Sequence, residues 1–359
     1  MKDTSGKNNY LELLRFLFAV ILVFHHSGFV AFDGIIPFPS GAIVADTFYI
    51  ITGFFLMKHL SREYDITSPL FYSVRYTFNK TKKLFPYALF GTTLAYILDI
   101  IRMPEGSVFE NYIEYGFTYI CELFFLPMTG IMKLTDSTSI HNAPLWFISA
   151  MLIALPFVMY IAIKAKKAFS YFLSWLLPLV IYSYLIVNYG DIVAWISYTG
   201  IVYTGVLRAF AGICLGCFGF SLVEKVSRCG KDMENLLTKI LLTVLELALF
   251  ALAIRNMYKG VNGYLSLYTL FSLFGMLMLT LSGKTFTSKL QFPFFAFLGK
   301  LSMPMFCIHW AIYKWLGSFF GYFGKYPCII LNIILCILSY FFIQFIRKLA
   351  GKNAKETVD

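Results

Sequence analysis

Charged residues are scarce in this chain. Asp, Glu, Lys and Arg make up 14% of the 359 residues, whereas soluble globular domains carry roughly 25%. Hydrophobic residues reach 59%, and the mean hydropathy is +0.72. The apolar residues fall in runs of about 20, long enough to cross a hydrocarbon core about 30 Å thick. The composition therefore excludes a soluble globular protein and predicts an all-α polytopic membrane protein whose residues 1–359 form one domain.

Several catalytic signatures are also missing. The sequence has no GxSxG elbow, no phosphate-binding glycine loop and no HExxH zinc pattern. Its five histidines are scattered over separate segments, so we expect neither a metal site nor a bound cofactor. The first apolar run lacks the small-residue cleavage pattern of a signal peptide. We therefore expect residues 1–9 to be a polar leader and the run after them to be a retained helix.

The seven cysteines lie mostly within apolar spans. Cys214 and Cys217 have the CxxC spacing that indicates redox or metal chemistry in a soluble chain. Here they lie in the segment AGICLGCFGF, where small residues favour close packing of helices. We interpret this motif as a packing surface rather than a reactive site.

The apolar runs give eleven candidate spans. Basic residues gather in residues 58–83, 164–167, 225–239 and 284–289 and in the tail, and the positive-inside rule expects all of these in the cytoplasm. Eleven crossings cannot satisfy that rule. The candidate spans are 10–31, 42–60, 84–102, 111–128, 144–163, 170–189, 199–223, 238–256, 263–282, 292–312 and 326–346.

Residues 111–128 are the candidate span that we expect not to cross the membrane. The segment around them contains Glu110, Glu114 and Glu122 and ends at Pro127, a poor composition for a helix facing lipid. Without it, ten helices cross, and a re-entrant or outer-side element lies near 109–143. Both termini, including the tail 347–359, are then cytoplasmic. The net charge of +11 belongs to cytoplasmic loops and indicates no nucleic-acid partner.

Arg15 and His26 share one apolar run. A helix turns about 100° per residue, so eleven residues bring the chain back to within roughly 20° of the same face. The two side chains should project from that face, about 16 Å apart along the axis. Ionisable groups at membrane depth usually face a bundle interior or a wet cavity. The pair predicts the wall of a transmembrane chamber, and His25, about 80° away, should lie outside it.

Asp46 should lie at a depth similar to that of His26, because it starts the next helix back. A carboxylate bonded to one imidazole nitrogen raises the basicity of the other. His26 and Asp46 are therefore a candidate general-base pair for a hydroxyl. A purely structural hydrogen bond between two helices is the alternative.

Further charged residues suggest ligand contacts. Arg75, Lys80, Lys82 and Lys83 could bind the phosphates of a nucleotide-bearing donor, although the positive-inside rule alone also produces such a cluster.

Two more polar groups lie within spans. Arg208 is a mid-span arginine that needs an anionic partner, for which Glu246 is a candidate. His309 should lie level with His26, either as a second polar group for an acceptor or as an interfacial histidine.

An ordered set of motifs resembles the membrane acyltransferase 3 family. Arg15 and His26 match the family's signature of arginine, ten residues and histidine. DTFYIITGFFL in 46–56 resembles its segment ending in Ser/Thr-Gly-Phe, and KLFPY in 83–87 resembles its Arg-x-x-Pro-Tyr motif. LWFIS in 145–149, with Trp146, resembles the tryptophan segment. LGKLSMPMFCIH in 298–309, with Ser302 and His309, resembles the late Leu-Gly-x-x-Ser…His segment.

The resemblance implies a ten-helix enzyme that moves an acyl group, most often acetyl from cytoplasmic acetyl-CoA, to a hydroxyl of a sugar, glycolipid or cell-wall polymer. His26 would be catalytic, Arg15 would support the donor, and Lys83 with Arg75 would contact the CoA phosphates. The expected partners are acyl-CoA, a glycan or glycolipid acceptor and the lipid bilayer, in a bacterial cytoplasmic membrane. Trp146, Arg208, Ser302 and His309 are assigned to the acceptor or the cavity.

Two residues depart from the family pattern. Met151 stands where many members have an acidic residue after the tryptophan motif. Lys83 stands where arginine is usual and cannot bind phosphate bidentately. A polysaccharide or glycolipid exporter of the same family and a structural membrane protein are the alternative functions.

Overall fold

The computed structural model describes residues 8–31, 33–62, 66–104, 109–134, 140–228, 235–320 and 324–356. Within these ranges the chain is helical, and one isolated bridge between Tyr198 and Tyr203 is its sole β-type pairing. The helices are α1 (Asn9–His25), α2 (Val44–Leu60), α3 (Pro69–Thr81), α4 (Phe85–Ile101), α5 (Phe109–Leu123), α6 (Trp146–Lys164), α7 (Lys166–Ala168), α8 (Ser174–Tyr189), α9 (Thr204–Arg228), α10 (Leu236–Lys259), α11 (Gly263–Ser282), α12 (Pro293–Phe319) and α13 (Lys325–Glu356).

The long helices confirm the predicted all-α polytopic class. Among the described residues, nine helices are long and apolar enough to cross a membrane. The pair α3 and α4, bent by 58°, makes a tenth crossing if it is one broken span. Pro86 lies in the first turn of α4, where its missing amide hydrogen costs nothing, so the helix restarts there after the bend.

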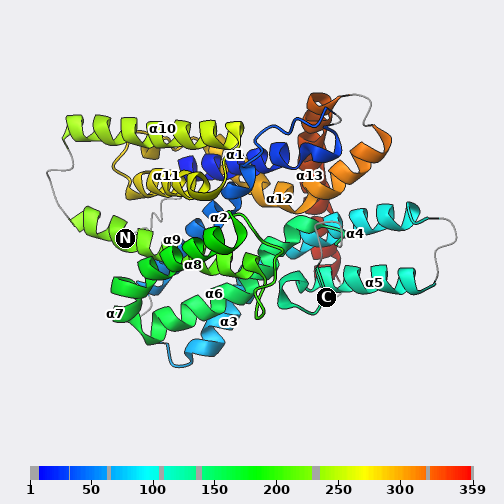
Figure 1. Cartoon of the computed structure of the whole chain (residues 1–359), viewed down its shortest axis with the longest axis horizontal. Helices are drawn as coiled ribbons and strands as arrows, with labels where there is room; N and C mark the ends of the chain where they lie inside the picture. Colours follow the sequence, from blue (N-terminus) through cyan, green and yellow to red (C-terminus); the bar gives the residue numbers. More distant parts are fainter. Residues whose placement is uncertain are drawn as a thin grey trace.

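The element near 109–143 does not form a long apolar span. Its helix α5 has 15 residues and is absent from the candidate crossings found in the described part of the chain. It packs beside α4, and the two helices form the hairpin at the right of Figure 1. Thr93 of α4 and Tyr119 of α5 share a hydrogen bond of 2.9 Å between their hydroxyls. The prediction that 111–128 is not an ordinary crossing is therefore consistent with the structure.

Helices α2 and α9 approach each other closely because glycines line their contact. A Cβ atom on Gly216 would lie 2.0 Å from the Ile50 carbonyl oxygen, and one on Gly53 would lie 1.9 Å from the Ile213 carbonyl oxygen. Cys217 donates its thiol to the Gly53 carbonyl at 3.4 Å in the same contact. Cys214 and Cys217 are both buried and free. The CxxC segment is a packing surface, as the sequence indicated.

Helices α1 and α12 run parallel and in contact along most of their length. Glu12 lies against Gly299, and Phe29 lies against Gly317, so positions increase together along the two helices. The Tyr313 hydroxyl donates to the Val23 carbonyl at 2.9 Å between these two levels. This pairing aligns the start of α1 with the start of α12 and the end of α1 with the later part of α12.

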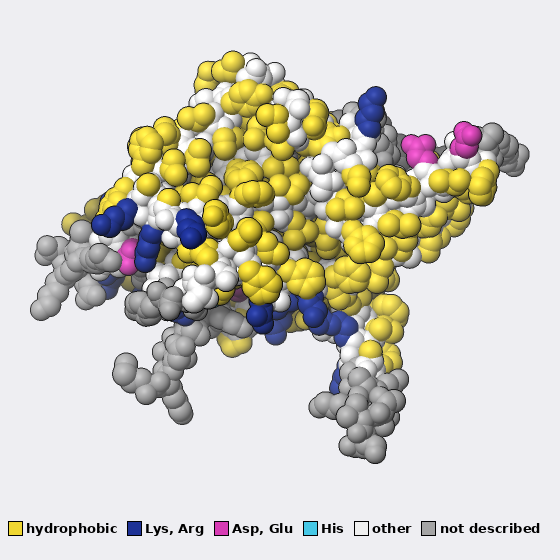
Figure 2. Space-filling view, turned by 90° about the horizontal axis from the view of Figure 1, so that it is seen from below, with side chains coloured by type: hydrophobic (Ala, Val, Ile, Leu, Met, Phe, Trp, Pro, Cys, Tyr) yellow, Lys and Arg dark blue, Asp and Glu magenta, His cyan; other side chains and the backbone are white. Residues whose placement is uncertain are grey.

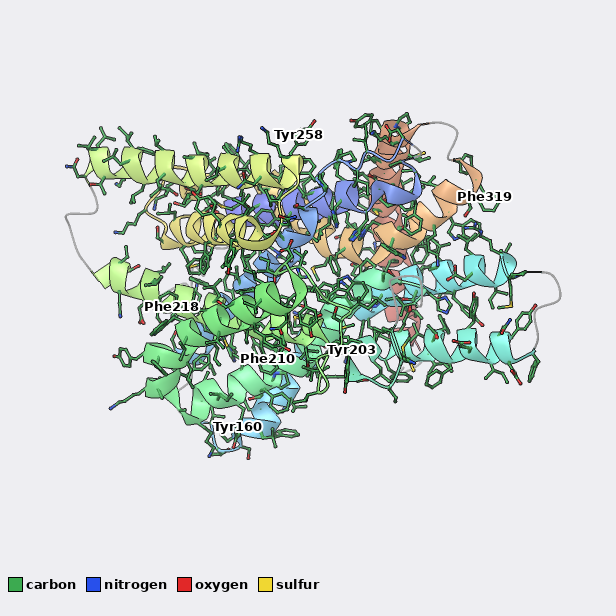
Figure 3. All side chains as sticks on the ribbon, in the orientation of Figure 1. Tyr160, Tyr203, Phe210, Phe218, Tyr258 and Phe319 are labelled. Atoms are coloured by element: carbon green, nitrogen blue, oxygen red, sulfur yellow. The ribbon has the colours of Figure 1, made fainter. Side chains whose placement is uncertain are left out.

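Most of the face shown in Figure 2 is covered by hydrophobic side chains. Lys and Arg gather along the lower and left edges of this face, and acidic side chains lie at its upper right. Figure 3 places Tyr258 at the end of α10 and Phe319 at the end of α12, and these side chains are 64% and 56% exposed. Aromatic residues at helix ends are typical of the boundary between lipid and water. The surface is that of a multi-pass membrane protein.

Candidate active site

His26 lies at the end of α1, where it is the C-cap residue. Its Nδ1 atom is 2.9 Å from Nε2 of His309 on α12, and the two rings are stacked with centroids 5.0 Å apart. His309 is fully buried, whereas His26 is partly exposed. The predicted match in depth between the two histidines is confirmed, because the parallel packing of α1 and α12 brings them into direct contact.

The hydrogen bonds of His309 determine which nitrogens carry protons. Nδ1 of His309 lies 2.8 Å from the Met305 carbonyl oxygen, and a carbonyl can only accept, so Nδ1 donates. In a neutral ring the other nitrogen, Nε2, is then an acceptor. It must accept its hydrogen bond from Nδ1 of His26. This leaves Nε2 of His26 with a free lone pair, which is what a general base requires.

The proposed pair of His26 and Asp46 is wrong. Asp46 is fully buried, and its carboxylate is bound by Nη2 of Arg208 at 2.5 Å and by the Tyr182 hydroxyl at 3.2 Å. The close packing of α2 on α9 turns Asp46 towards Arg208 instead of α1. The sequence therefore predicted the wrong partner for the Asp46 side chain.

Arg208 does not pair with Glu246 either. The guanidinium binds Asp46, donates to the carbonyls of Val193 and Ala42, and lies 5.0 Å from the centre of the Trp146 ring. Glu246 instead accepts hydrogen bonds from Thr280 and Thr287. Arg208 and Glu246 thus each have partners other than one another. Asp46, Arg208 and Tyr182 form a fully buried polar cluster.

Two other candidate residues lie in separate surroundings. Trp146 stacks on Trp195 with ring centroids 5.4 Å apart and belongs with Arg208. Ser302 is buried and donates to the Gly299 carbonyl of its own helix at 2.8 Å. Within the described part of the chain, neither forms a hydrogen bond or ring contact with His26. The assignment of these two residues to an acceptor site has no support from their contacts.

Arg15 is held at the other end of α1. Its Nη1 atom binds both carboxylate oxygens of Glu12, at 3.1 and 2.9 Å. Glu12 in turn packs on Gly299 of α12, where a Cβ atom would lie 2.0 Å from Oε2. The absence of a side chain at Gly299 therefore permits the position of the carboxylate that orients Arg15. This chain therefore needs a glycine at position 299 to keep Glu12 in this place.

A substitution at Gly299 tests this arrangement. We expect Gly299→Val to displace Glu12 and so to misplace Arg15. The affinity of Arg15 for its ligand should then fall by about five- to tenfold, the effect of losing one charged hydrogen bond. Activity with acyl-CoA as the donor would show this as a raised donor KM. Gly275→Val is the matched control, since its Cβ atom would meet only a flexible leucine end at 3.1 Å. An unchanged donor KM in Gly299→Val would contradict the role of Glu12.

The predicted donor residues lie around the bend between α3 and α4. Arg75, Lys82 and Lys83 are exposed, and Lys80 is partly exposed. Lys80 lies within electrostatic range of Arg15, so the structure brings these two predicted donor residues into one region. Arg75, Lys82 and Lys83 form an exposed basic group around the same bend.

Comparison with known proteins agrees with the motifs. The family model described as an acyltransferase domain matches residues 8–348, nearly the whole chain. The chain belongs to the acyltransferase 3 family. Neither the search of curated proteins nor that of solved structures finds a match. Membership of the family makes the chain a membrane acyltransferase in class and leaves its donor and acceptor to be argued from the site.

A pocket of this acyltransferase lies near the end of α1, with Phe29 in its lining. It has a volume of about 420 Å³ and lies between α4, α5, α12 and the segments around residues 29, 131–133 and 140–141. We call it the α5 pocket. The Trp310 ring lines it and also meets the His26 ring edge-on, with centroids 5.3 Å apart. The sequence had not singled out Trp310 as a site residue.

A charged cluster forms one wall of the α5 pocket. Asp99 binds Nζ of Lys314 at 2.5 Å and Nδ1 of His141 at 2.6 Å. Nε2 of His141 faces the Tyr115 carbonyl oxygen at 3.0 Å, so both ring nitrogens face acceptors and the ring is held in its protonated form. Burial acts to lower the pKa of His141, but the hydrogen bond to Asp99 and the charge of Glu122 raise that pKa above its ordinary value.

A second pocket lies at the opposite ends of the helices. It has a volume of about 670 Å³ and is formed by the last turns of α2, α6 and α9 together with the π-helical turn Phe169–Leu173. Lys166, Lys167 and Lys225 line it. The sequence showed the lysines of 164–167 only as a topological signal. Among the described residues, no group of three His, Cys, Asp or Glu side chains could hold a metal ion.

Proposed function

We propose that this acyltransferase moves an acyl group, with acetyl as the first donor to test, from cytoplasmic acyl-CoA to a hydroxyl of a surface polysaccharide or glycolipid. The observation that carries the proposal is the free Nε2 of His26, fixed by the hydrogen bonds to His309 and Met305. The ring of His26 meets Trp310, which lines a pocket that could admit an acceptor.

The chemistry follows from that atom. Nε2 of His26 takes the proton of the acceptor hydroxyl while its oxygen attacks the thioester carbonyl. The carbon–sulfur bond breaks, and the thiolate leaves and takes up the proton from His26. The result is an oxygen ester and free CoA, so atoms and charges balance. In this scheme His26 acts as a base and then as an acid without a covalent intermediate.

The donor approaches from the other end of α1. Arg15 and Lys80 lie there together, with the exposed Arg75, Lys82 and Lys83 nearby. Positive charges suit the phosphates of CoA. Arg15 and His26 are about 16 Å apart along the helix axis, a length that the flexible arm of CoA could span. The basic loops support a cytoplasmic location for this end and for both termini, in a bacterial cytoplasmic membrane.

The test of the function is direct transfer. The purified protein in lipid nanodiscs is incubated with acetyl-CoA labelled in the acetyl group and with surface glycan from a source strain that lacks this gene. We expect label in alkali-labile esters of the glycan and an equal amount of free CoA thiol. Glycan that crosses the membrane of proteoliposomes unmodified, with no thiol released, would favour the exporter instead.

His309 has a positioning role that can be measured separately. Replacing it by alanine removes the acceptor for Nδ1 of His26, so the ring can rotate and change tautomer. We expect kcat to fall by about 10- to 100-fold, the usual effect of losing a residue that orients a reactive histidine. His309→Gln restores an acceptor oxygen and should recover part of the loss. A kcat equal to that of the wild type in His309→Ala would contradict the positioning role of His309.

The two basic regions can be distinguished by donor affinity. We expect Lys82→Gln with Lys83→Gln to raise the KM for acetyl-CoA by about five- to twentyfold with little change in kcat, because each exposed contact to phosphate contributes about 1 kcal/mol. Lys166→Gln with Lys167→Gln is the matched control in the second pocket and should leave this KM unchanged. The reverse result would move the donor site to the second pocket.

A further inference from the structure

We propose that the α5 pocket binds the acceptor as a single polyhydroxylated sugar ring, and that Asp99, Lys314 and Trp310 select it. This inference rests on the proposed function and adds to it the place and the chemical class of the acceptor group. None of these three residues was predicted from the sequence to act in the site.

The position of the pocket is the first argument. The Trp310 ring meets the His26 ring in a T-shaped contact, with centroids 5.3 Å apart, and it also lines the pocket. Phe29, three residues after His26, lines the pocket too and meets Trp310 edge-on at 4.9 Å between centroids. A ligand in the pocket that rests on Trp310 therefore lies against the same ring that His26 contacts. A volume of about 420 Å³ is within the usual range for small-molecule sites.

The chemistry of the lining is the second argument. Phe29, Tyr115, Phe117 and Trp310 provide aromatic surface for the apolar face of a sugar ring. Each sugar hydroxyl both donates and accepts, so a rim of hydroxyls needs acceptors and donors together. Asp99 offers the acceptors, and Lys314 is a donor beside it.

The ion pairs of the lining argue against the donor as the occupant. The side chains of Asp99 and Glu114 line the pocket together with those of Lys133, His141 and Lys314. Asp99 already pairs with both Lys314 and His141, so these two cations are not free to hold the multiple phosphates of CoA. The α5 pocket also lies at the end of α1 opposite to Arg15, and Arg15 is the residue proposed above to contact the donor.

The experiment separates acceptor binding from donor binding. The nanodisc assay is run with the labelled acetyl-CoA and the glycan fraction described above, and KM is measured for each substrate. We expect Asp99→Asn, Lys314→Gln and Trp310→Ala each to raise the acceptor KM by about tenfold or more, as expected for one charged hydrogen bond or one stacking contact. The donor KM should stay within about twofold of wild type, and Trp310→Phe should retain most of the acceptor affinity.

A second variant tests the pocket without disturbing the charged cluster of Asp99, His141 and Lys314. Thr118 lines the pocket from α5 without belonging to the cluster. Thr118→Trp should fill the pocket and raise the acceptor KM while the thermal unfolding temperature stays unchanged. Glu110→Gln, an exposed change on the same helix outside the pocket, is the control and should have no effect.

The outcomes are distinct. No transfer by the wild-type protein overturns the proposed function. Transfer by the wild type with unchanged acceptor KM in Thr118→Trp and Trp310→Ala overturns the pocket assignment alone. An equal rise in both KM values shows a structural role for the cluster and also overturns it.

Discussion

Replacing His26 by alanine should lower kcat for acyl transfer by roughly 10²- to 10⁴-fold, the range of a lost general base. The substitution removes the one nitrogen that the hydrogen-bond chain from Met305 through His309 leaves unprotonated and unpaired. The donor KM should change little, because Arg15 and the basic residues lie at the other end of α1. Steady-state kinetics with labelled acetyl-CoA and the glycan fraction measure both quantities.

Two control variants make this result specific. His26→Asn keeps an amide donor near the place of Nδ1, so it can still bind Nε2 of His309 but cannot act as a base; it should be as inactive as alanine. His25→Ala changes the adjacent histidine, whose Nδ1 binds the Phe38 carbonyl at 3.0 Å on another side of the helix end. His25→Ala should retain at least about a third of wild-type kcat. Substantial activity in His26→Asn would show that His26 is structural.

The sequence predicted correctly that His26 and His309 lie at one level, but it predicted the wrong partner for Asp46. Alternating crossings gave His26, Asp46 and His309 similar depths, and two of these three do meet. Hydrophobic runs specify the ends of helices, but they leave open which helices pack together. The pairing of α1 with α12 depends on Gly299 and Gly317, and that of α2 with α9 depends on Gly53 and Gly216. These close contacts involve residues more than 150 positions apart, which no local pattern reveals.

The α5 pocket illustrates the same limit. The acidic residues of 110–122 predicted that this segment is unusual, and it is. What they could not predict is that Glu122 binds the backbone amides of His141 and Asn142 and so positions the loop that carries His141. Burial raises the pKa of Glu122 to about 7. Of the three acidic residues in this segment, Glu122 is buried in that contact, whereas Glu110 and Glu114 are exposed.

The buried pair of Asp46 and Arg208 should dominate stability. Removing one partner leaves the other charge buried without compensation, which typically costs about 3–5 kcal/mol. We therefore expect Asp46→Ala and Arg208→Leu each to lower the free energy of unfolding by about that amount. Denaturant unfolding in mixed micelles, followed by tryptophan fluorescence, measures the change.

The double variant Asp46→Leu with Arg208→Leu decides whether Asp46 acts in stability alone. With both charges replaced by apolar groups, much of the lost stability should return, because a buried ion pair and a hydrophobic contact are often nearly equal in free energy. If Asp46 only binds Arg208 and Tyr182, kcat in the folded double variant should remain near wild type. A kcat as low as that of His26→Ala, in a protein of restored stability, would instead return Asp46 to the chemistry of His26. The contacts favour the first result, since the carboxylate has its hydrogen bonds to α8 and α9 and the base at His26 is oriented by α12.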